Sequence, residues 1–181
     1  EDWRAISGNI VFPGFTAPKL KWMQNHEPDL FSQIHKVLLP KDYLRLWLTG
    51  EYISDPSDSA GTSWLNTATR DWSDDLLALS DLERGHMPDI VEGSAPGGNL
   101  RQDISSRWGF RPSIVVAGGG GDNAASGIGV GAVSDGQAFL SLGTSGVLFA
   151  ATDAYSPAPE TAVHTFCHAV PNTWHQMGVI L

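Results

Sequence analysis

The chain has 181 residues, of which 41% are hydrophobic and 17% are charged, a composition typical of a globular protein rather than a disordered one. The formal net charge of −9, without any run of Lys or Arg, excludes nucleic acid as an expected partner, although a backbone nest can still hold a small phosphate. The single cysteine, Cys167, excludes an intrachain disulfide and favours a reducing, cytoplasmic location, and no apolar stretch approaches the roughly 18 to 20 residues of a membrane span.

The first part of the chain predicts three helices. Apolar residues recur at mixed spacings of three and four across residues 18–34, and Pro28 interrupts them, which indicates two short helices. Residues 37–39 predict a brief buried strand. A further helix is expected to begin at Pro40 and to end at Gly50 as its C-cap.

The next part is rich in short polar residues. Residues 53–63 combine Ser, Asp and Gly, which favour a structured loop, and Ser73 is expected to cap a helix that continues to Leu79, before Pro88 ends the region. The acidic residues of this part are interpreted as solvated loop and helix-cap charge: Asp55, Asp58, Asp71, Asp74 and Asp75.

The middle of the chain leads from a strand into a glycine turn. Residues 93–100 predict a turn-rich link, and a short helix is expected around residues 104–108. The apolar residues 113–117 predict a buried strand that breaks directly into four glycines. A helix rich in small residues is expected across residues 123–132, where glycines permit close packing.

Two hairpins are expected at the end of the chain. Strands at residues 137–142 and 147–151 flank a turn at 143–146. A second hairpin pairs residues 163–170 with 173–181.

The segment AGGGGDNAASGIGVG, residues 117–131, is the first candidate site. It places Asp122 and Asn123 behind a glycine turn, at the start of a helix whose N-terminus carries about half a positive charge. An ionised Asp122 can accept a hydrogen bond from a substrate hydroxyl, and Asn123 can both donate and accept, so the pair suits a polyol. The alternative is that Asp122 only caps a helix. A dinucleotide-binding fingerprint is not favoured, because the glycines lack the register of G-x-G-x-x-G.

The segment LSLGTSG, residues 140–146, is the second candidate site. Consecutive N–H groups and hydroxyls of Gly143, Thr144 and Ser145 can cradle phosphate oxygens, but a polar hairpin turn would have the same sequence. No metal site is predicted, since His164 and Cys167 would face opposite sides of a strand. Four tryptophans are expected in the core or in domain packing: Trp64, Trp72, Trp108 and Trp174.

Four segments together resemble one family. In order and spacing they are PGFTAPKLKW, KVLLPKDYLRLWLTGEYISDPSDSAGTSWL, AGGGGDNAASGIGVG and LSLGTSGVLFA, and they resemble the central part of the FGGY carbohydrate kinases, in the branch that acts on xylulose. The resemblance covers essentially the whole chain, and the four-glycine run is one residue longer than the usual GGGDN.

The resemblance implies an α/β fold of the ribonuclease H-like, actin and hexokinase ATPase kind, with sugar and ATP meeting between two domains. Residues 1–133 would be the C-terminal part of the N-terminal, sugar-binding domain, and residues 134–181 the beginning of the C-terminal, ATP-binding domain. The chain begins with Glu1 and ends within an apolar strand, so we expect a fragment, inactive alone without the family's DLGTS-like phosphate loop and its glycine-rich adenosine motif.

The implied activity is ATP-dependent phosphorylation of the terminal hydroxyl of a ketopentose, D-xylulose, to D-xylulose 5-phosphate. Asp122 would be the catalytic proton acceptor and Asn123 a substrate contact, while Gly143, Thr144 and Ser145 would lie near the ATP phosphates that Mg²⁺ bridges. Other sugars, namely glycerol, gluconate and ribulose, and a catalytically silent sugar-binding relative stay open as alternatives. A homodimer is among the expected assemblies, and no membrane partner is expected.

Overall fold

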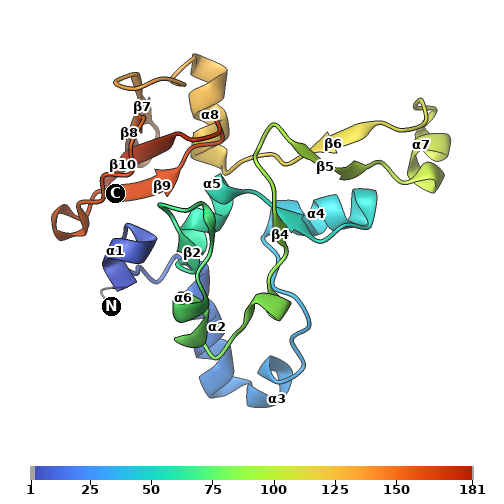
Figure 1. The fold of residues 1–181 in the computed structure, drawn as a ribbon, viewed down its shortest axis with the longest axis horizontal. Helices are drawn as coiled ribbons and strands as arrows, with labels where there is room; N and C mark the ends of the chain where they lie inside the picture. Colours follow the sequence, from blue (N-terminus) through green and yellow to red (C-terminus); the bar gives the residue numbers. More distant parts are fainter. Residues whose placement is uncertain (1–2, 181) are drawn as a thin grey trace.

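The computed structural model describes residues 3–180 and contains short helices, small sheets and one larger sheet (Figure 1). The α-helices are α1 (Trp3–Ser7), α2 (Thr16–His26), α3 (Pro28–Phe31), α4 (Pro40–Thr49), α5 (Pro56–Ser59), α6 (Asp74–Ala78), α7 (Gln102–Trp108) and α8 (Asp122–Val130). The strands are β1 (Ile53–Ser54), β2 (Leu65–Asn66), β3 (Asp71–Trp72), β4 (Asp89–Ile90), β5 (Pro96–Asn99), β6 (Val115–Ala117), β7 (Ala138–Leu142), β8 (Gly146–Thr152), β9 (His164–Cys167) and β10 (Trp174–Ile180). Three 3₁₀ turns, η1 (Ala60–Thr62), η2 (Arg84–His86) and η3 (Pro159–Thr161), complete the described part.

The largest sheet is antiparallel, with strand order β7-β8-β10-β9. Three strand pairs accompany it: β1 with β4 is parallel, and β2 with β3 and β5 with β6 are antiparallel. In Figure 1 the large sheet and α8 lie at one side of the molecule, while β5, β6 and α7 project to the other, with α4 near their base. No helix within residues 3–180 is long and apolar enough to cross a membrane.

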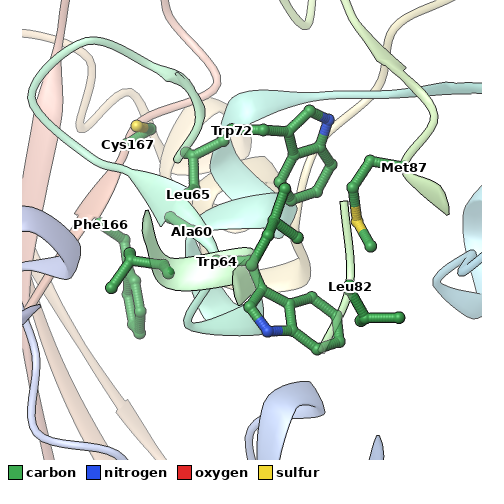
Figure 2. Packing of buried hydrophobic residues seen from close by; sticks show 10 residues of the cluster. Ala60, Trp64, Leu65, Trp72, Leu82, Met87, Phe166 and Cys167 are labelled. Carbon is green, nitrogen blue, oxygen red and sulfur yellow. The ribbon is translucent and has the colours of Figure 1, made fainter. Parts of the chain in front are cut away.

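The main core lies around the segment that follows α5. Trp64 is 1% exposed and Trp72 is 7% exposed, and Figure 2 shows both indoles among Leu65, Leu82 and Met87. Both indole N–H groups are bonded, that of Trp64 to a serine hydroxyl and that of Trp72 to a backbone carbonyl. Burying each large side chain of this kind stabilises the fold by about 1.5 to 3 kcal/mol.

The other two tryptophans behave differently. Trp174 is half-buried, and its indole N–H donates to the carbonyl of Thr67 at 2.7 Å. Trp108 is 49% exposed and contacts Trp47 and Phe110 on the projecting part of the molecule, so it is not a core residue of the described part, and its role in domain packing stays a prediction.

Helix α4 buries its charges and exposes its apolar side chains. Asp42 and Arg45 are buried, whereas Tyr43, Leu44 and Trp47 are between 46% and 66% exposed. The helix begins at Pro40 and ends at Gly50, which adopts a left-handed φ of 85°, as the sequence predicted. The polar face of α4 is turned inward, and from it Arg45 contacts the glycine turn at residues 118–121.

The local predictions for helices were confirmed, whereas three predictions that concern strands differ from the structure. Residues 37–39 are half-buried coil, with Val37 donating to the carbonyl of His86 but with no partner strand. The link at 93–100 contains β5, which pairs with β6 through an irregular register. Strand β6 exists but is not buried, since Val115 is 56% exposed. Strand pairing and burial depend on distant segments, which local composition does not reveal.

Both C-terminal hairpins form as predicted, and α8 packs against the sheet they build. Phe149 on β8 is fully buried and stacks on Phe139 with ring centroids 4.8 Å apart. A side chain at Gly127 would lie 3.0 Å from the ring of Phe149. The small residues of α8 therefore permit close packing against the sheet, as expected.

Candidate functional site

The glycine turn at residues 118–121 is bonded to the protein along most of its length. The N–H of Gly118 donates to Ala95 at 2.8 Å, and the N–H of Gly119 donates to Gly93 at 2.9 Å. The N–H of Gly121 donates to Ser57 Oγ at 2.9 Å. These groups are therefore engaged by the protein and do not form an open phosphate cradle.

Glycine is required in this turn for space and for backbone conformation. A side chain at Gly118 would overlap the carbonyl oxygen of Glu92, and Gly119 has a φ of 82°, which side chains other than hydrogen rarely tolerate. The glycines therefore allow neighbouring backbone to approach the turn closely. The sequence had suggested instead that they allow a ligand to approach.

Arg45 anchors the first glycine of the turn from α4. Its Nη2 group donates to the carbonyl of Gly118, while Nη1 donates to the carbonyl of Ile53 at 2.7 Å and to Asp42 Oδ1 at 3.2 Å. The side chain is only 5% exposed. A buried guanidinium with several fixed acceptors holds its partners in one geometry.

Lys41 joins three carboxylates beneath the turn. Its Nζ lies 2.5 Å from Asp42 Oδ1, 2.6 Å from Asp55 Oδ2 and 3.5 Å from Asp58 Oδ2. Burial alone would lower the pKa of Lys41, but the carboxylates of Asp55 and Asp42 outweigh it and raise that pKa above its ordinary value. Burial raises the pKa of Asp58, and the positive charge of Lys41 partly offsets this.

The network corrects one sequence interpretation. Asp55 caps α5, which agrees with the expected helix-cap role, but it is 0% exposed, so the expectation of solvated charge was wrong for it, and Asp58 is only half-buried. Asp71, Asp74 and Asp75 are exposed as expected, and Arg84 pairs with the first two. The role of five residues was not predicted from the sequence: Lys41, Asp42, Arg45, Asp55 and Ser57. The available signal was the presence of three charged residues, Lys41, Asp42 and Arg45, in a helix whose other residues are mostly apolar.

Asp122 begins α8 directly after the glycine turn, and its side chain is exposed. Its Oδ1 accepts hydrogen bonds from the backbone N–H of Asn123 at 2.7 Å and from Asn123 Nδ2 at 3.1 Å. Gly121 is the N-cap of the helix, with no side-chain cap, so the carboxylate is not the helix cap. The second carboxylate oxygen leaves acceptor capacity for a ligand.

A pocket of about 120 Å³ lies beside Asp122 and Asn123. Three parts of the chain line it: Ser57, Asp58 and Gly61 near α5; residues 121–124 at the start of α8; and Phe166, His175 and Met177 from β9 and β10. Asp122 therefore lines a concave surface built from segments far apart in the sequence.

His175 contributes a neutral ring to this pocket. It is 2% exposed and stacks on Phe149 with ring centroids 4.3 Å apart. Burial, together with the nearby His168, lowers the pKa of His175 to about 3. The ring is uncharged at neutral pH, so it adds no positive charge to the pocket.

The second predicted group lies elsewhere. Gly143, Thr144 and Ser145 form the exposed tip of the hairpin between β7 and β8, where the N–H of Gly143 donates to the carbonyl of Ser145 at 2.9 Å. None of the three lines the pocket beside Asp122.

The residues weighed as metal ligands have structural partners. His164 Nδ1 lies 3.0 Å from Asn9 Oδ1, and the thiol of Cys167 is directed to the carbonyl of Thr67 at 3.4 Å. Burial raises the pKa of the Cys167 thiol to about 12. Within residues 3–180 no three His, Cys, Asp or Glu side chains are grouped so as to hold a metal ion.

The fold and the motifs define a class of protein. Residues 1–129 match the N-terminal domain of the FGGY family of carbohydrate kinases, and the chain belongs to this family. Its fold is the α/β, actin and hexokinase-like ATPase fold that these kinases share.

Particular relatives are similar over nearly the whole chain. The xylulose kinase of Klebsiella pneumoniae is 57% identical over 178 residues, and that of Escherichia coli (strain K12) is 58% identical over 178 residues, in each case over 98% of this chain and 37% of the relative. A crystal structure of a xyloylose kinase from Brucella ovis shares 66% identity with a TM-score of 0.97, over 99% of this chain and 37% of that one. The chain thus spans about 37% of the length of these relatives.

Proposed function

We propose that the enzyme carrying this chain transfers the γ-phosphoryl group of ATP to the terminal hydroxyl of D-xylulose, forming D-xylulose 5-phosphate and ADP. The observation that supports this most is the exposed carboxylate of Asp122, which stands on a pocket at the start of α8. Similarity to proteins named xylulose kinase supports the choice of sugar.

In this proposal Asp122 orients the attacking hydroxyl and accepts its proton. The new bond forms between the sugar oxygen and the γ-phosphorus, the bond from that phosphorus to the ADP oxygen breaks, and the proton passes to the carboxylate late in the step. An ordinary aspartate is too weak a base to deprotonate an alcohol beforehand. Asn123, hydrogen-bonded to Asp122 and lining the same pocket, would contact neighbouring sugar hydroxyls.

We assign the contact with ATP to the tip of the hairpin between β7 and β8. Gly143, Thr144 and Ser145 are exposed there and offer N–H and hydroxyl groups to phosphate oxygens. Mg²⁺ enters the proposal as the companion of ATP that neutralises charge on its phosphates. We also propose a division into a sugar-binding part, residues 1–133, and an ATP-binding part, residues 134–181, in a cytoplasmic enzyme that can form a homodimer.

A sugar panel tests the proposed activity. The purified intact enzyme would be given ATP, Mg²⁺ and, in separate reactions, D-xylulose, ribulose, glycerol and gluconate, with ADP release followed by a coupled assay. We expect the highest kcat/KM with D-xylulose. A higher kcat/KM with another sugar would contradict the substrate, and sugar binding without ADP release would contradict the transfer itself.

A further inference from the structure

We propose that Ser57 is a positioning residue for Asp122, in that its hydroxyl, oriented by the buried Asp55 and Lys41, fixes the backbone directly before the carboxylate. The proposal rests on the role proposed above for Asp122. It assigns a role in the reaction to the hydrogen bonds of Ser57, which also lines the pocket, and to Lys41 and Asp55, which do not line it.

The direction of the hydrogen bonds follows from their chemistry. Ser57 Oγ lies 2.5 Å from Asp55 Oδ1, and an ionised carboxylate can only accept, so the hydroxyl donates its hydrogen to Asp55. The oxygen of the same hydroxyl then accepts from the N–H of Gly121 at 2.9 Å. The Asp55 carboxylate can only accept and the Gly121 N–H can only donate, so the Ser57 hydroxyl has a single arrangement between them.

Asp55 is itself held from several sides. Its Oδ1 also accepts from the backbone N–H of Ser57 at 2.9 Å and of Asp58 at 3.2 Å, while Oδ2 lies 2.6 Å from Lys41 Nζ. A buried ion pair is often no more stabilising than apolar residues of the same volume. Its value here lies in fixing the orientation of the Ser57 hydroxyl.

Asp122 depends on its backbone for its position. The hydrogen bonds of its carboxylate are to Asn123, inside the same helix turn, and move with that helix. The turn before it is held at one end by Arg45, on the carbonyl of Gly118, and at the other by Ser57, on the N–H of Gly121. Releasing the end next to Asp122 shifts the carboxylate, and a misplacement of about 1 Å can cost on the order of a hundredfold in rate.

The test compares Ser57→Ala with Ser80→Ala in the intact enzyme. Ser80 is a matched control because both serines are 6% exposed, and Ser80 Oγ accepts from Trp64 Nε1 at 2.9 Å, while neither of these two residues lines the pocket. We expect similar losses of Tm in both variants. Only Ser57→Ala should lower kcat, by about 10- to 100-fold, with the KM values for sugar and ATP changed less than about threefold.

A second pair of variants keeps the proposal testable if Ser57→Ala fails to fold. Ser57→Thr and Ser57→Val each add a methyl group and have nearly the same shape, but only threonine keeps the hydroxyl, so we expect threonine to retain kcat and valine to lose it. Equal kcat in the two, or a kcat loss in Ser80→Ala as large as in Ser57→Ala, would overturn the proposal. Asp122→Asn in the same assay separates the failures: if it keeps wild-type kcat, the function proposed for Asp122 is wrong, and if it loses kcat while Ser57→Ala does not, only the positioning is wrong.

Discussion

The two glycine-containing turns of this chain, GGGG at residues 118–121 and GTSG at residues 143–146, have very different surroundings. The turn at residues 118–121 is bonded by its N–H groups to segments around residue 94 and to Ser57, and Arg45 binds its first carbonyl. The turn at 143–146 is exposed, and a side chain at Gly143 would meet only the carbonyl of Ser145, at 3.8 Å. The first turn is fixed in place by residues distant in the sequence, whereas the second is a free hairpin tip.

The presence of glycines alone does not show whether a turn is rigid. Glycine permits a tight backbone path, but rigidity comes from the partners of that path. A carboxylate at a rigid turn suits orientation of a reacting hydroxyl, and an exposed, adaptable tip suits contact with a phosphate that arrives and leaves. The predictions below test whether the two turns differ in this way.

The largest expected loss of stability follows removal of Lys41. Lys41→Met leaves the buried carboxylate of Asp55 without its cation and that of Asp42 with Arg45 alone, which should lower the free energy of unfolding by about 3 kcal/mol, the lower end for a broken buried pair because Lys41 is 25% exposed. Urea unfolding measures this. Lys21→Met is the control, since Lys21 pairs with Asp81 at the surface, and an equal loss in both would contradict the buried network.

The next largest expected loss of stability compares the two turns directly. Gly118→Ala forces a methyl group against the carbonyl of Glu92, and we expect a loss of about 2 to 3 kcal/mol by urea unfolding. The same substitution at Gly143 meets open space and should change the free energy of unfolding by less than about 0.5 kcal/mol. Equal losses at the two sites would mean that the turns do not differ in their support.

The dependence of stability on pH tests the burial of His175, which lines the pocket beside the turn at residues 118–121. The pKa of His175 is about 3 in the folded chain, against about 6.5 when unfolded, so between these values the unfolded state binds more protons and stability falls as pH falls. This residue should contribute a loss of about 2 kcal/mol between pH 6.5 and pH 5. We expect His175→Phe to show a shallower pH dependence in urea unfolding, and an unchanged slope would contradict burial of a neutral ring.

The smallest expected effect is on the second turn. Thr144→Ala removes an exposed hydroxyl at the hairpin tip and should leave the free energy of unfolding within about 0.5 kcal/mol of the wild type. If the tip contacts ATP as proposed, the KM for ATP should rise by a few fold while the KM for the sugar stays constant. A change confined to the sugar KM would reverse the assignment of the two turns.

Local features of the fold were predictable from sequence, and the support of the site was not. Helix α4, with Pro40 at its start and Gly50 at its end, depends on signals within a few residues. The position of Asp122 at the start of α8 followed for the same reason. The burial of Asp55 was missed, because a loop rich in Ser and Asp has the same composition whether solvent or Lys41 and the glycine turn surround it. Strand β5 was missed because its pairing with β6 is non-local.

The most direct test of the account is the turnover of Asp122→Asn in the intact enzyme, measured as ADP release with D-xylulose and paired with a binding measurement for the sugar. Asparagine retains an oxygen that can accept the hydrogen bonds from Asn123, so the start of α8 should be preserved. We expect kcat to fall by about a hundredfold or more while sugar affinity changes by only a few fold. Turnover close to that of the wild type would show that Asp122 does not accept the proton.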